Sequence, residues 1–352
     1  MATKLPLTIQ TSYQELVELA SLSQFKSDFP EGGNFFKTRI KDRDYWYYQS
    51  PQVDGKRFKK YVGPDSEKMR SYIERHRRHE DDLRQRRTIV RSLLGAGVPG
   101  PDNMTGRILN ALSQAGVFRM RAVVVGTVAY QCYSGLLGYR LGSAAVRTGD
   151  LDIAQFNSIS VAVEDQIDVP ILDVLKGVDE HFEAIPDLSG GATRYALGPY
   201  RVEFLVPNRG PDTGDPIPLP AIQTEGIPLR FLDYLIYEEK QAVALWGPGI
   251  LINVPSPIRY ALHKIIVSVS RASTAESMAK AQKDRMQAEE LISVLLKVDP
   301  WGLADGLEEL LARGTGWKKR FEKGRALLGQ HLRDILEPER IRSMNEQGSL
   351  IN

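Results

Sequence analysis

A buried strand that stops at a glycine, followed by a helix and then by two aspartates, constrains this chain more than any other feature. Residues 122–125 are apolar and rich in β-branched side chains, which is typical of a buried strand. Gly126 ends the run, and Thr127 is the expected N-cap of a helix that begins at Val128. Free backbone N–H groups at the start of a helix bind phosphate. The sequence therefore predicts a phosphate-binding turn between a strand and a helix.

A second strand is expected to carry Asp150 and Asp152 on either side of Leu151. Side chains at positions i and i+2 of a strand share one face, roughly 7 Å apart. Two carboxylates so placed repel each other, and a divalent cation between them relieves the repulsion. We expect Mg²⁺ there, with Mn²⁺ as a substitute. Nucleotidyl transfer requires groups of this kind, namely an acid pair that binds metal and a turn that binds phosphate.

A third acid lies on a later strand. Residues 200–206 alternate apolar and polar side chains, so Val202 and Phe204 are expected to face the core. Glu203 then points to the opposite face, where it can join the two aspartates around a two-metal centre. The alternative is that Glu203 is a solvated strand residue paired with Arg201.

This set resembles the DNA polymerase β-type nucleotidyltransferase superfamily, whose pattern is glycine followed by serine or a similar residue, an Asp-x-Asp strand, and a later strand with a third acid. Within it, the chain looks most like the AbiEii-type nucleotidyltransferases of bacterial abortive-infection and toxin systems. Their Arg-x-Thr/Ser-x-Asp-x-Asp style approach is matched loosely by Arg147 and Thr148. The resemblance covers about residues 117–297. It implies a polymerase β-like α/β (α+β) core with a mixed sheet, and an enzyme that moves an NMP from an NTP to a hydroxyl.

The resemblance also implies roles for single residues. Lys264 would be the lysine found on one C-terminal helix of these enzymes, and Asp284 the acid on a later helix. Each also has an ordinary interpretation, Lys264 as a surface lysine and Asp284 as the partner of Lys280 on an exposed helix. The catalytic and metal-binding residues would be Asp150, Asp152 and Glu203, and those that bind the NTP would be Gly126, Thr127, Arg147 and Lys264.

Three features depart from the family pattern. Thr127 stands where serine is usual, and it keeps the hydroxyl. The third acid is Glu203 rather than aspartate, one methylene longer. The glutamate expected upstream of Lys264 is missing, and Pro257 and Ile258 lie in that region.

The composition constrains the number of domains and the cellular setting. The chain has 352 residues and ordinary hydrophobic and charged contents of 42% and 26%, so we expect a globular protein of three domains, 1–97, 98–256 and 257–352. The single cysteine, Cys132, excludes an internal disulfide, and a reducing cytoplasm is the expected setting. No signal peptide is apparent, and no apolar run reaches the roughly 18 residues of a membrane span, so no membrane partner is expected.

The first domain is expected to be a basic module. Residues 35–97 contain 17 Lys and Arg against 9 Asp and Glu, although the whole chain has a formal net charge of only +2. Strands are predicted at 34–41, 45–49 and 56–62, with Asp54 and Gly55 as a hairpin signal, and a long charged helix follows at 66–94. A helix near 12–22 precedes the sheet, and residues 42–44 form a turn. In outline this resembles the small arm-type DNA-binding modules of phage-like integrases.

Aromatic side chains among basic ones suit nucleic acid, because cations bind phosphates and rings stack on bases. We therefore expect tRNA, another RNA or DNA as the acceptor. The alternative is that Trp46 and its neighbours pack the sheet against the helix and that the lysines are a solvated face, in which case the module joins copies of the chain into a homo-oligomer or docks a partner. An antitoxin is a separate candidate partner of the chain. The candidate nucleic-acid-binding residues are Trp46, Lys56, Arg57, Lys59 and Lys60.

The C-terminal domain is expected to be a helical bundle that brings Lys264 toward the triphosphate. Helical spacing is present at 258–271 and 274–297, further helices are expected at 303–311 and 317–328, and the last dozen residues look frayed. Two other functions use the same residues. One is nucleotidylation of a protein or small molecule, and the other is a nucleic-acid-binding regulator with a catalytically silent core.

Overall fold

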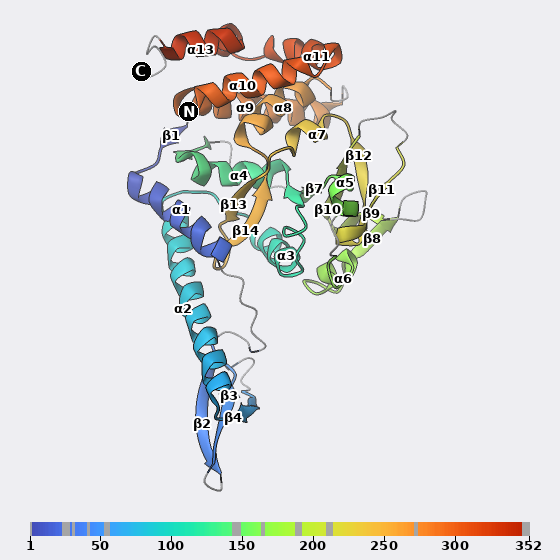
Figure 1. Cartoon of the computed structure of the whole chain (residues 1–352). Helices are drawn as coiled ribbons and strands as arrows, with labels where there is room; N and C mark the ends of the chain where they lie inside the picture. The colour runs from blue at the N-terminus through green and yellow to red at the C-terminus, as the bar shows by residue number, and fades with distance from the viewer. Residues whose placement is uncertain are drawn as a thin grey trace.

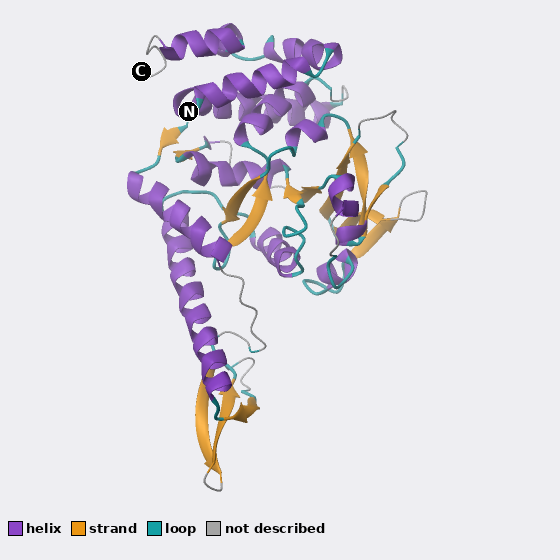
Figure 2. Ribbon diagram, viewed as in Figure 1, coloured by secondary structure: helices purple, strands orange, loops and turns teal. Residues whose placement is uncertain are grey.

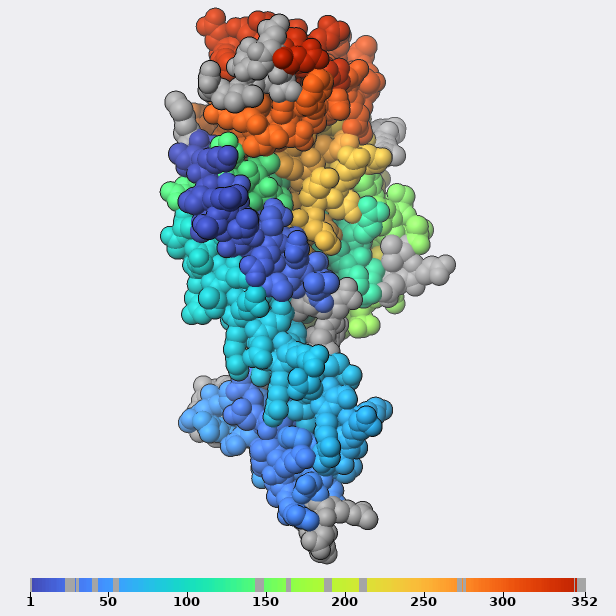
Figure 3. Space-filling view, turned by 60° about the vertical axis from the view of Figure 1, so that its left-hand side comes forward, coloured from blue at the N-terminus to red at the C-terminus, as the bar shows by residue number. Residues whose placement is uncertain are grey.

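The chain forms a body from which a long arm projects (Figure 1, Figure 3). We describe it from a computed structural model, which describes residues 2–22, 29, 32–40, 43–52, 57–142, 149–162, 166–186, 192–208, 214–270 and 274–346. The arm consists of helix α2 and, at its far end, an antiparallel sheet in the order β2-β3-β4. Its elements are α2 (Glu67–Gly95), β2 (Asn34–Ile40), β3 (Arg43–Gln49) and β4 (Lys59–Pro64).

The three predicted strands of the arm are confirmed, with different ends. Strand β3 begins at Arg43, because its ladder with β2 extends to the pair Ile40 and Arg43, so residues 43 and 44 of the predicted turn belong to the strand, and residue 42 lies outside the described residues. Strand β4 begins only at Lys59. The hairpin signal at residues 54–55 and Lys56 lie outside the described residues.

Helix α2 is held at both of its ends. Ser66 caps it, since its hydroxyl accepts a hydrogen bond from the backbone N–H of Met69. Near this end Ile73 packs against Phe35 and Tyr48 of the sheet. Near the body the buried Arg86 donates to the backbone carbonyls of residues 248 and 249, at 3.0 and 2.7 Å. The helix therefore connects the small sheet firmly to the body.

The body contains a mixed sheet with the order β11-β12-β10-β7-β5, in which β9 also pairs with β10 and β8 with β9. Strand β10 is parallel to β7 and β12 but antiparallel to β9, and β5 is antiparallel to β7. The predicted mixed α/β architecture is thus confirmed. The strands are β5 (Val123–Val124), β7 (Asp150–Ala154), β8 (Glu183–Pro186), β9 (Ala192–Leu197), β10 (Tyr200–Pro207), β11 (Ile217–Leu219) and β12 (Thr224–Leu229).

Helices cover the sheet and stack over one end of the body (Figure 2). One large apolar core joins the sheet to these helices, and it includes Phe204, Leu262, Leu291 and Leu307. The helices of the sheet region are α3 (Asn103–Gln114), α4 (Gly126–Leu137), α5 (Asn157–Ala162), α6 (Ile171–Lys176), the 3₁₀ turn η2 (Pro220–Ile222) and α7 (Leu232–Leu235). The C-terminal helices are α8 (Pro257–Ser268), α9 (Ala275–Val298), α10 (Pro300–Ala312), α11 (Thr315–Arg325), α12 (Gln330–Ile335) and α13 (Pro338–Glu346).

The end of the described chain is ordered rather than frayed. Helix α13 reaches Glu346, and Ile341 is fully buried in the core, so the prediction of a frayed end is wrong for residues 341–346. The polar composition of this segment predicted a frayed end, but packing of the buried Ile341 side chain stabilises the helix. Residues 347–352 lie outside the described part.

The N-terminal helix α1 (Leu7–Leu22) packs on the body, not on the small sheet, and it begins earlier than the predicted position 12. Tyr13 exchanges hydrogen bonds with the backbone of Val243 at 3.1–3.2 Å. A second apolar cluster joins α1, the base of α2 and a β-hairpin. That hairpin is β13 (Lys240–Ala244) with β14 (Ile250–Val254), and a further small ladder pairs β1 (Thr3–Lys4) with β6 (Tyr139–Arg140). Within the described residues, no helix has the length and apolar character needed to cross a membrane.

Candidate active site

The turn between β5 and α4 requires glycine. Gly126 has a φ of +68°, in the region that favours glycine, and a Cβ there would lie 2.9 Å from Asp152 Oδ2. The helix begins at Gly126, and its N-cap, Val125, makes no side-chain cap. The prediction of Thr127 as N-cap is therefore wrong, because Thr127 already lies in the first turn. Its hydroxyl accepts a hydrogen bond from Lys283 at 3.1 Å.

The three predicted acids lie on one face of the sheet. Strands β7 and β10 are parallel neighbours, and Asp152 is the register partner of Glu203. Asp150 lies two residues earlier on the same strand, so its side chain leaves from the same face. The opposite face carries Val202 and Phe204, both fully buried, as the alternation predicts.

The carboxylate of Glu203 forms an ion pair with Arg194 of β9, at 3.3 Å, rather than with Arg201. The guanidinium of Arg201 instead donates to the backbone carbonyls of Gly198 and Tyr200. Among the described residues, no three His, Cys, Asp or Glu side chains are gathered closely enough to hold an ion as they stand. Glu203 therefore shares the face of the aspartates but is bound to an arginine.

Asp152 carries a carboxyl group with two other acids nearby. Burial, together with the nearby Asp150 and Glu203, raises the pKa of its carboxyl group to about 7, although Lys264 and Lys280 oppose the shift. A carboxylate with this environment gains a great deal from a bound cation. The three candidate ligands supply only hard oxygen atoms, which suit Mg²⁺ or Mn²⁺. The residues present therefore fit a divalent metal.

Helices α8 and α9 bring lysines to this site. Lys264 Nζ lies 2.6 Å from Asp284 Oδ1, and both side chains are largely buried. The interpretation of Asp284 as a residue of an exposed helix is wrong, since it is only 2% exposed. Lys280 and Lys283 are not among the site residues predicted from the sequence. Their signal was helical spacing, because positions 280, 283, 284 and 287 share one face of α9.

Polar contacts tie the helices to the glycine turn. The Tyr260 hydroxyl on α8 donates to the Gly126 carbonyl at 3.0 Å. On α9, Gln287 lies 3.3 Å from the same hydroxyl, and Glu290 accepts a hydrogen bond from Tyr130 of α4 at 2.8 Å. Helices α4, α8 and α9 are thus fixed relative to one another at the turn.

A cavity of about 440 Å³ opens beside Gly126, Asp152 and Lys264. Its other walls include apolar side chains from β10, β12, α7 and α8. Phe231 lines it with a φ of +67°, and the Phe231 ring meets Trp317 edge-on at 4.6 Å. A polar end beside the acids and an apolar end with an aromatic ring suit a nucleotide.

The remaining candidate residues lie elsewhere. Arg147 lies outside the described residues. Of the four described arm candidates, three lie on the small sheet and Arg57 lies just before β4; this sheet is at the opposite end of the molecule from the C-terminal helices (Figure 1). Trp46 packs against the cluster between sheet and α2, whereas three basic residues are exposed: Arg57, Lys59 and Lys60.

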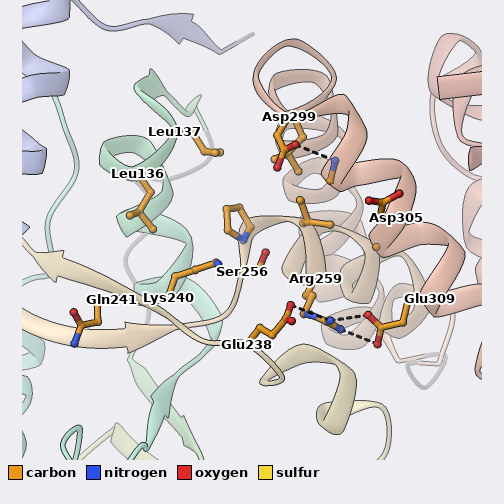
Figure 4. A pocket seen from close by; sticks show the side chains of 15 residues that line it. Leu136, Leu137, Glu238, Lys240, Gln241, Ser256, Arg259, Asp299, Asp305 and Glu309 are labelled. Carbon is orange, nitrogen blue, oxygen red and sulfur yellow. Dashed lines mark hydrogen bonds and ion pairs between the residues drawn. The ribbon is translucent and has the colours of Figure 1, made fainter. Parts of the chain in front are cut away.

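A second cavity, of about 570 Å³, lies between the β13 region, α8 and α10 (Figure 4). Arg259 points across it to Glu309 at 2.6 Å and to Glu238 at 3.3 Å. None of the candidate site residues lines this cavity. It shares no lining residue with the cavity beside Asp152, so the two cavities are separate.

Comparison with known proteins agrees with this geometry. A family described as Nucleotidyltransferase matches residues 103–312, which run from the start of α3 to the end of α10. That is more than half of the chain, and it includes all three acids, the glycine turn and the lysines of α8 and α9. No curated protein and no solved structure gives a significant match. The chain belongs to this nucleotidyltransferase family and is an enzyme of the nucleotidyl-transferring class.

Proposed function

We propose that the protein transfers an NMP from an NTP to the hydroxyl of a nucleic acid in a Mg²⁺-dependent reaction. The observation that carries the proposal is the alignment of Asp150, Asp152 and Glu203 on one sheet face beside Gly126. The attacking hydroxyl oxygen forms a bond to the α-phosphorus, the bond to the β-phosphate oxygen breaks, and pyrophosphate leaves.

The acids would hold the metal and activate the acceptor. Asp150 and Asp152 are the residues for two Mg²⁺ ions, with Glu203 completing the set, and Mn²⁺ has suitable chemistry to replace Mg²⁺. Bound there, the ions would stabilise charge on the attacking and leaving oxygens. The Glu203 carboxylate then lies beside the attacking hydroxyl and favours loss of its proton. For this role it has to exchange its contact with Arg194.

The turn and the lysines would hold the triphosphate. Backbone N–H groups at the start of α4 point toward a phosphate bound at Gly126, and the Thr127 hydroxyl adds a polar contact. Lys264 and Lys283 bring positive charge to the same place. Positive charge near the departing pyrophosphate lowers the barrier, because phosphoryl chemistry depends on positioning and charge neutralisation. Arg147, three residues before β7 in the sequence, is assigned to the NTP by resemblance alone.

A nucleic-acid acceptor is supported by the arm. Its sequence carries a large surplus of positive charge, and its basic residues Arg57, Lys59 and Lys60 are exposed. An enzyme that modifies only a small metabolite has no need for such a projection. The pairing of Lys264 with Asp284 also supports the closer relationship to AbiEii-type enzymes, and with it a role in a toxin or phage-defence system that includes an antitoxin.

The deciding experiment incubates the protein with each α-³²P-labelled NTP, Mg²⁺ and separate cellular fractions of RNA, DNA, protein and metabolites. Label is expected in the RNA or DNA fraction, and only with the wild-type chain, not with Asp152→Asn. Label in protein or metabolites would place the acceptor in another class. Absence of label from every fraction, together with absence of NTP binding, would point instead to a catalytically silent regulator.

A further inference from the structure

The small sheet of the arm has two faces of different character. The face toward α2, which we call the helix face, buries Phe35 and Tyr48 against Ile73. Trp46 belongs to this face as well, and its indole N–H donates to Asp65 at 2.9 Å. The ring that looked most suited to stacking on a base is thus occupied in holding the sheet to its helix.

The face turned away from α2, which we call the outer face, carries four aromatic rings. Cross-strand register places Phe36 beside Tyr47 and Tyr47 beside Tyr61. The ring centroids are 5.9 Å apart in the first pair and 5.6 Å in the second, and Tyr45 lies 6.2 Å from Tyr61. Tyr61 is 52% exposed. Within the described part of the chain, the recorded ring contacts of these four side chains are with one another and with Lys59.

Charge on the outer face is positive. Lys59 Nζ lies 4.6 Å from the ring centre of Phe36 and 4.8 Å from that of Tyr47. The other outward strand positions whose side chains the structure describes are uncharged, and include Asn34, Thr38 and Gln49. Asp65 is bound on the helix face by Arg70 and Lys37, at 2.6 and 2.8 Å, and these partners lower the pKa of its carboxyl group.

We propose that the outer face is a platform for single-stranded nucleic acid, with bases stacked on its four rings and phosphates held by Lys59. Unpaired bases expose the π-faces that rings can stack on, whereas a duplex hides them. A second copy of the chain would set Lys59 against Lys59, and an apolar protein partner would strip water from this ammonium group. As an account of the acceptor, the inference rests on the function proposed above, but binding itself can be measured without turnover.

The test uses the full-length chain with Asp152→Asn, so that no NMP is transferred. Fluorescence anisotropy measures its binding to labelled oligo(dT), oligo(U) and a duplex, each of roughly 20 units, at several salt concentrations. Single strands should bind more tightly than the duplex. Replacing Tyr47 and Tyr61 together by leucine should weaken single-strand binding by about 10-fold or more, the scale of one or more lost base–ring stacks. Tyr61→Phe should retain it, because the ring remains.

The chain offers a matched control for charge. Lys59 and Lys60 are adjacent and both exposed, but Lys60 Nζ lies over Phe29 on the helix face, at 5.2 Å. Lys59→Ala should therefore weaken single-strand binding clearly more than Lys60→Ala, although each removes one charge. Circular dichroism confirms that each variant is folded.

Equal losses in the two lysine variants, equal affinity for duplex and single strands, or no binding at low salt would overturn the proposal. A dimer that dissociates on the tyrosine substitutions would also overturn it, in favour of self-association. Binding by the arm without any transfer activity in the wild type would contradict the proposed function but not this inference. If the outer-face substitutions leave transfer to nucleic acid unchanged, this inference would be contradicted, but the proposed function would not.

Discussion

At the scale of single residues, Asp152 is the centre of the site. Its carboxyl group lies against Gly126, where a Cβ would come within 2.9 Å of it, and its pKa is raised by burial and by two other acids. We predict that Asp150→Asn or Asp152→Asn lowers the rate of transfer on the order of 100- to 1000-fold, the loss typical of removing one electrostatic stabiliser. The apo protein should keep or gain thermal stability, because carboxylate repulsion is relieved.

Single-turnover kinetics and thermal unfolding without metal measure these two effects. Leu151→Val, which changes the buried side chain between the aspartates, is the matched control and should retain activity. Full activity in either Asn variant would refute the assignment of the acid pair.

The raised pKa of Asp152 makes metal binding depend on pH. Its carboxyl has a pKa of about 7 in the folded protein, whereas an unfolded aspartate titrates near 4, so the folded chain holds the extra proton between these values. The stability contributed by this group therefore falls as pH rises through that window. A cation must displace the proton, so Mg²⁺ affinity should rise by up to about 10-fold per pH unit below pH 7 and then level off.

Calorimetric titration of Mg²⁺ from about pH 5.5 to pH 8.5 checks this expectation. The Asp152→Asn variant should bind weakly with a flat pH profile. A wild-type affinity that does not change below pH 7 would show that this carboxyl does not hold the metal.

Glu203 should act on turnover more than on binding. Its proposed partner is the acceptor hydroxyl, and its present partner is Arg194 at 3.3 Å. Glu203→Gln should lower the single-turnover rate steeply, while the affinity for a nonhydrolysable NTP changes by less than about 3-fold, because a group that acts only in the transition state contributes little to ground-state binding. Equal losses in rate and affinity would instead make Glu203 a residue for metal affinity or structure.

At the scale of elements, the site is made where α8 and α9 meet the turn before α4. The buried pair Lys264 and Asp284 joins the two helices. Lys264→Met leaves a buried carboxylate without this partner and should cost about 3–5 kcal/mol of stability, together with NTP affinity. The double variant Lys264→Met/Asp284→Asn should recover most of the stability but not the NTP affinity.

Chemical denaturation and binding of a fluorescent NTP analogue separate these two effects. Recovery of NTP affinity along with stability in the double variant would mean that Lys264 serves the fold alone. If Lys264→Met retains its NTP affinity, Lys264 likewise serves the fold alone.

Local patterns made part of this site predictable, and the contacts between elements explain the rest. Alternation along β10 gave the directions of Val202 and Glu203 correctly, because a strand has period two. Helical spacing placed Lys283 and Asp284 on one face of α9, but spacing does not say which neighbour that face meets. The same limit applies to Trp46, since both faces of the arm sheet are aromatic and only the packing of α2 decides between them.

At the scale of the whole molecule, the arm holds its sheet at a set distance from the body. The sheet packs on α2 near Ile73, and the helix joins the body at Arg86 and Val90. Seventeen residues separate Ile73 from Val90, which is about 25 Å of helix. Because both ends of the helix are packed, we expect the arm to act as a spacer rather than as a loose tether.

The spacing predicts that the length of the acceptor decides whether the arm matters. Because 25 Å is the length of the helix between its two packed ends, an acceptor that reaches from the outer face to the site needs at least about eight nucleotides, at roughly 3.4 Å each. For single-stranded acceptors longer than this, the Tyr47→Leu/Tyr61→Leu variant should lower kcat/KM on the order of 10-fold, as expected for lost stacking. Acceptors of two or three nucleotides cannot reach the outer face, so wild type and variant should use them equally.

Steady-state kinetics with a length series of the fraction that accepts label measures this dependence, and Lys60→Ala serves as the control. A variant that loses activity equally at every length would show that the substitutions disturb the body, whereas unchanged kcat/KM on long acceptors would remove the arm from substrate binding.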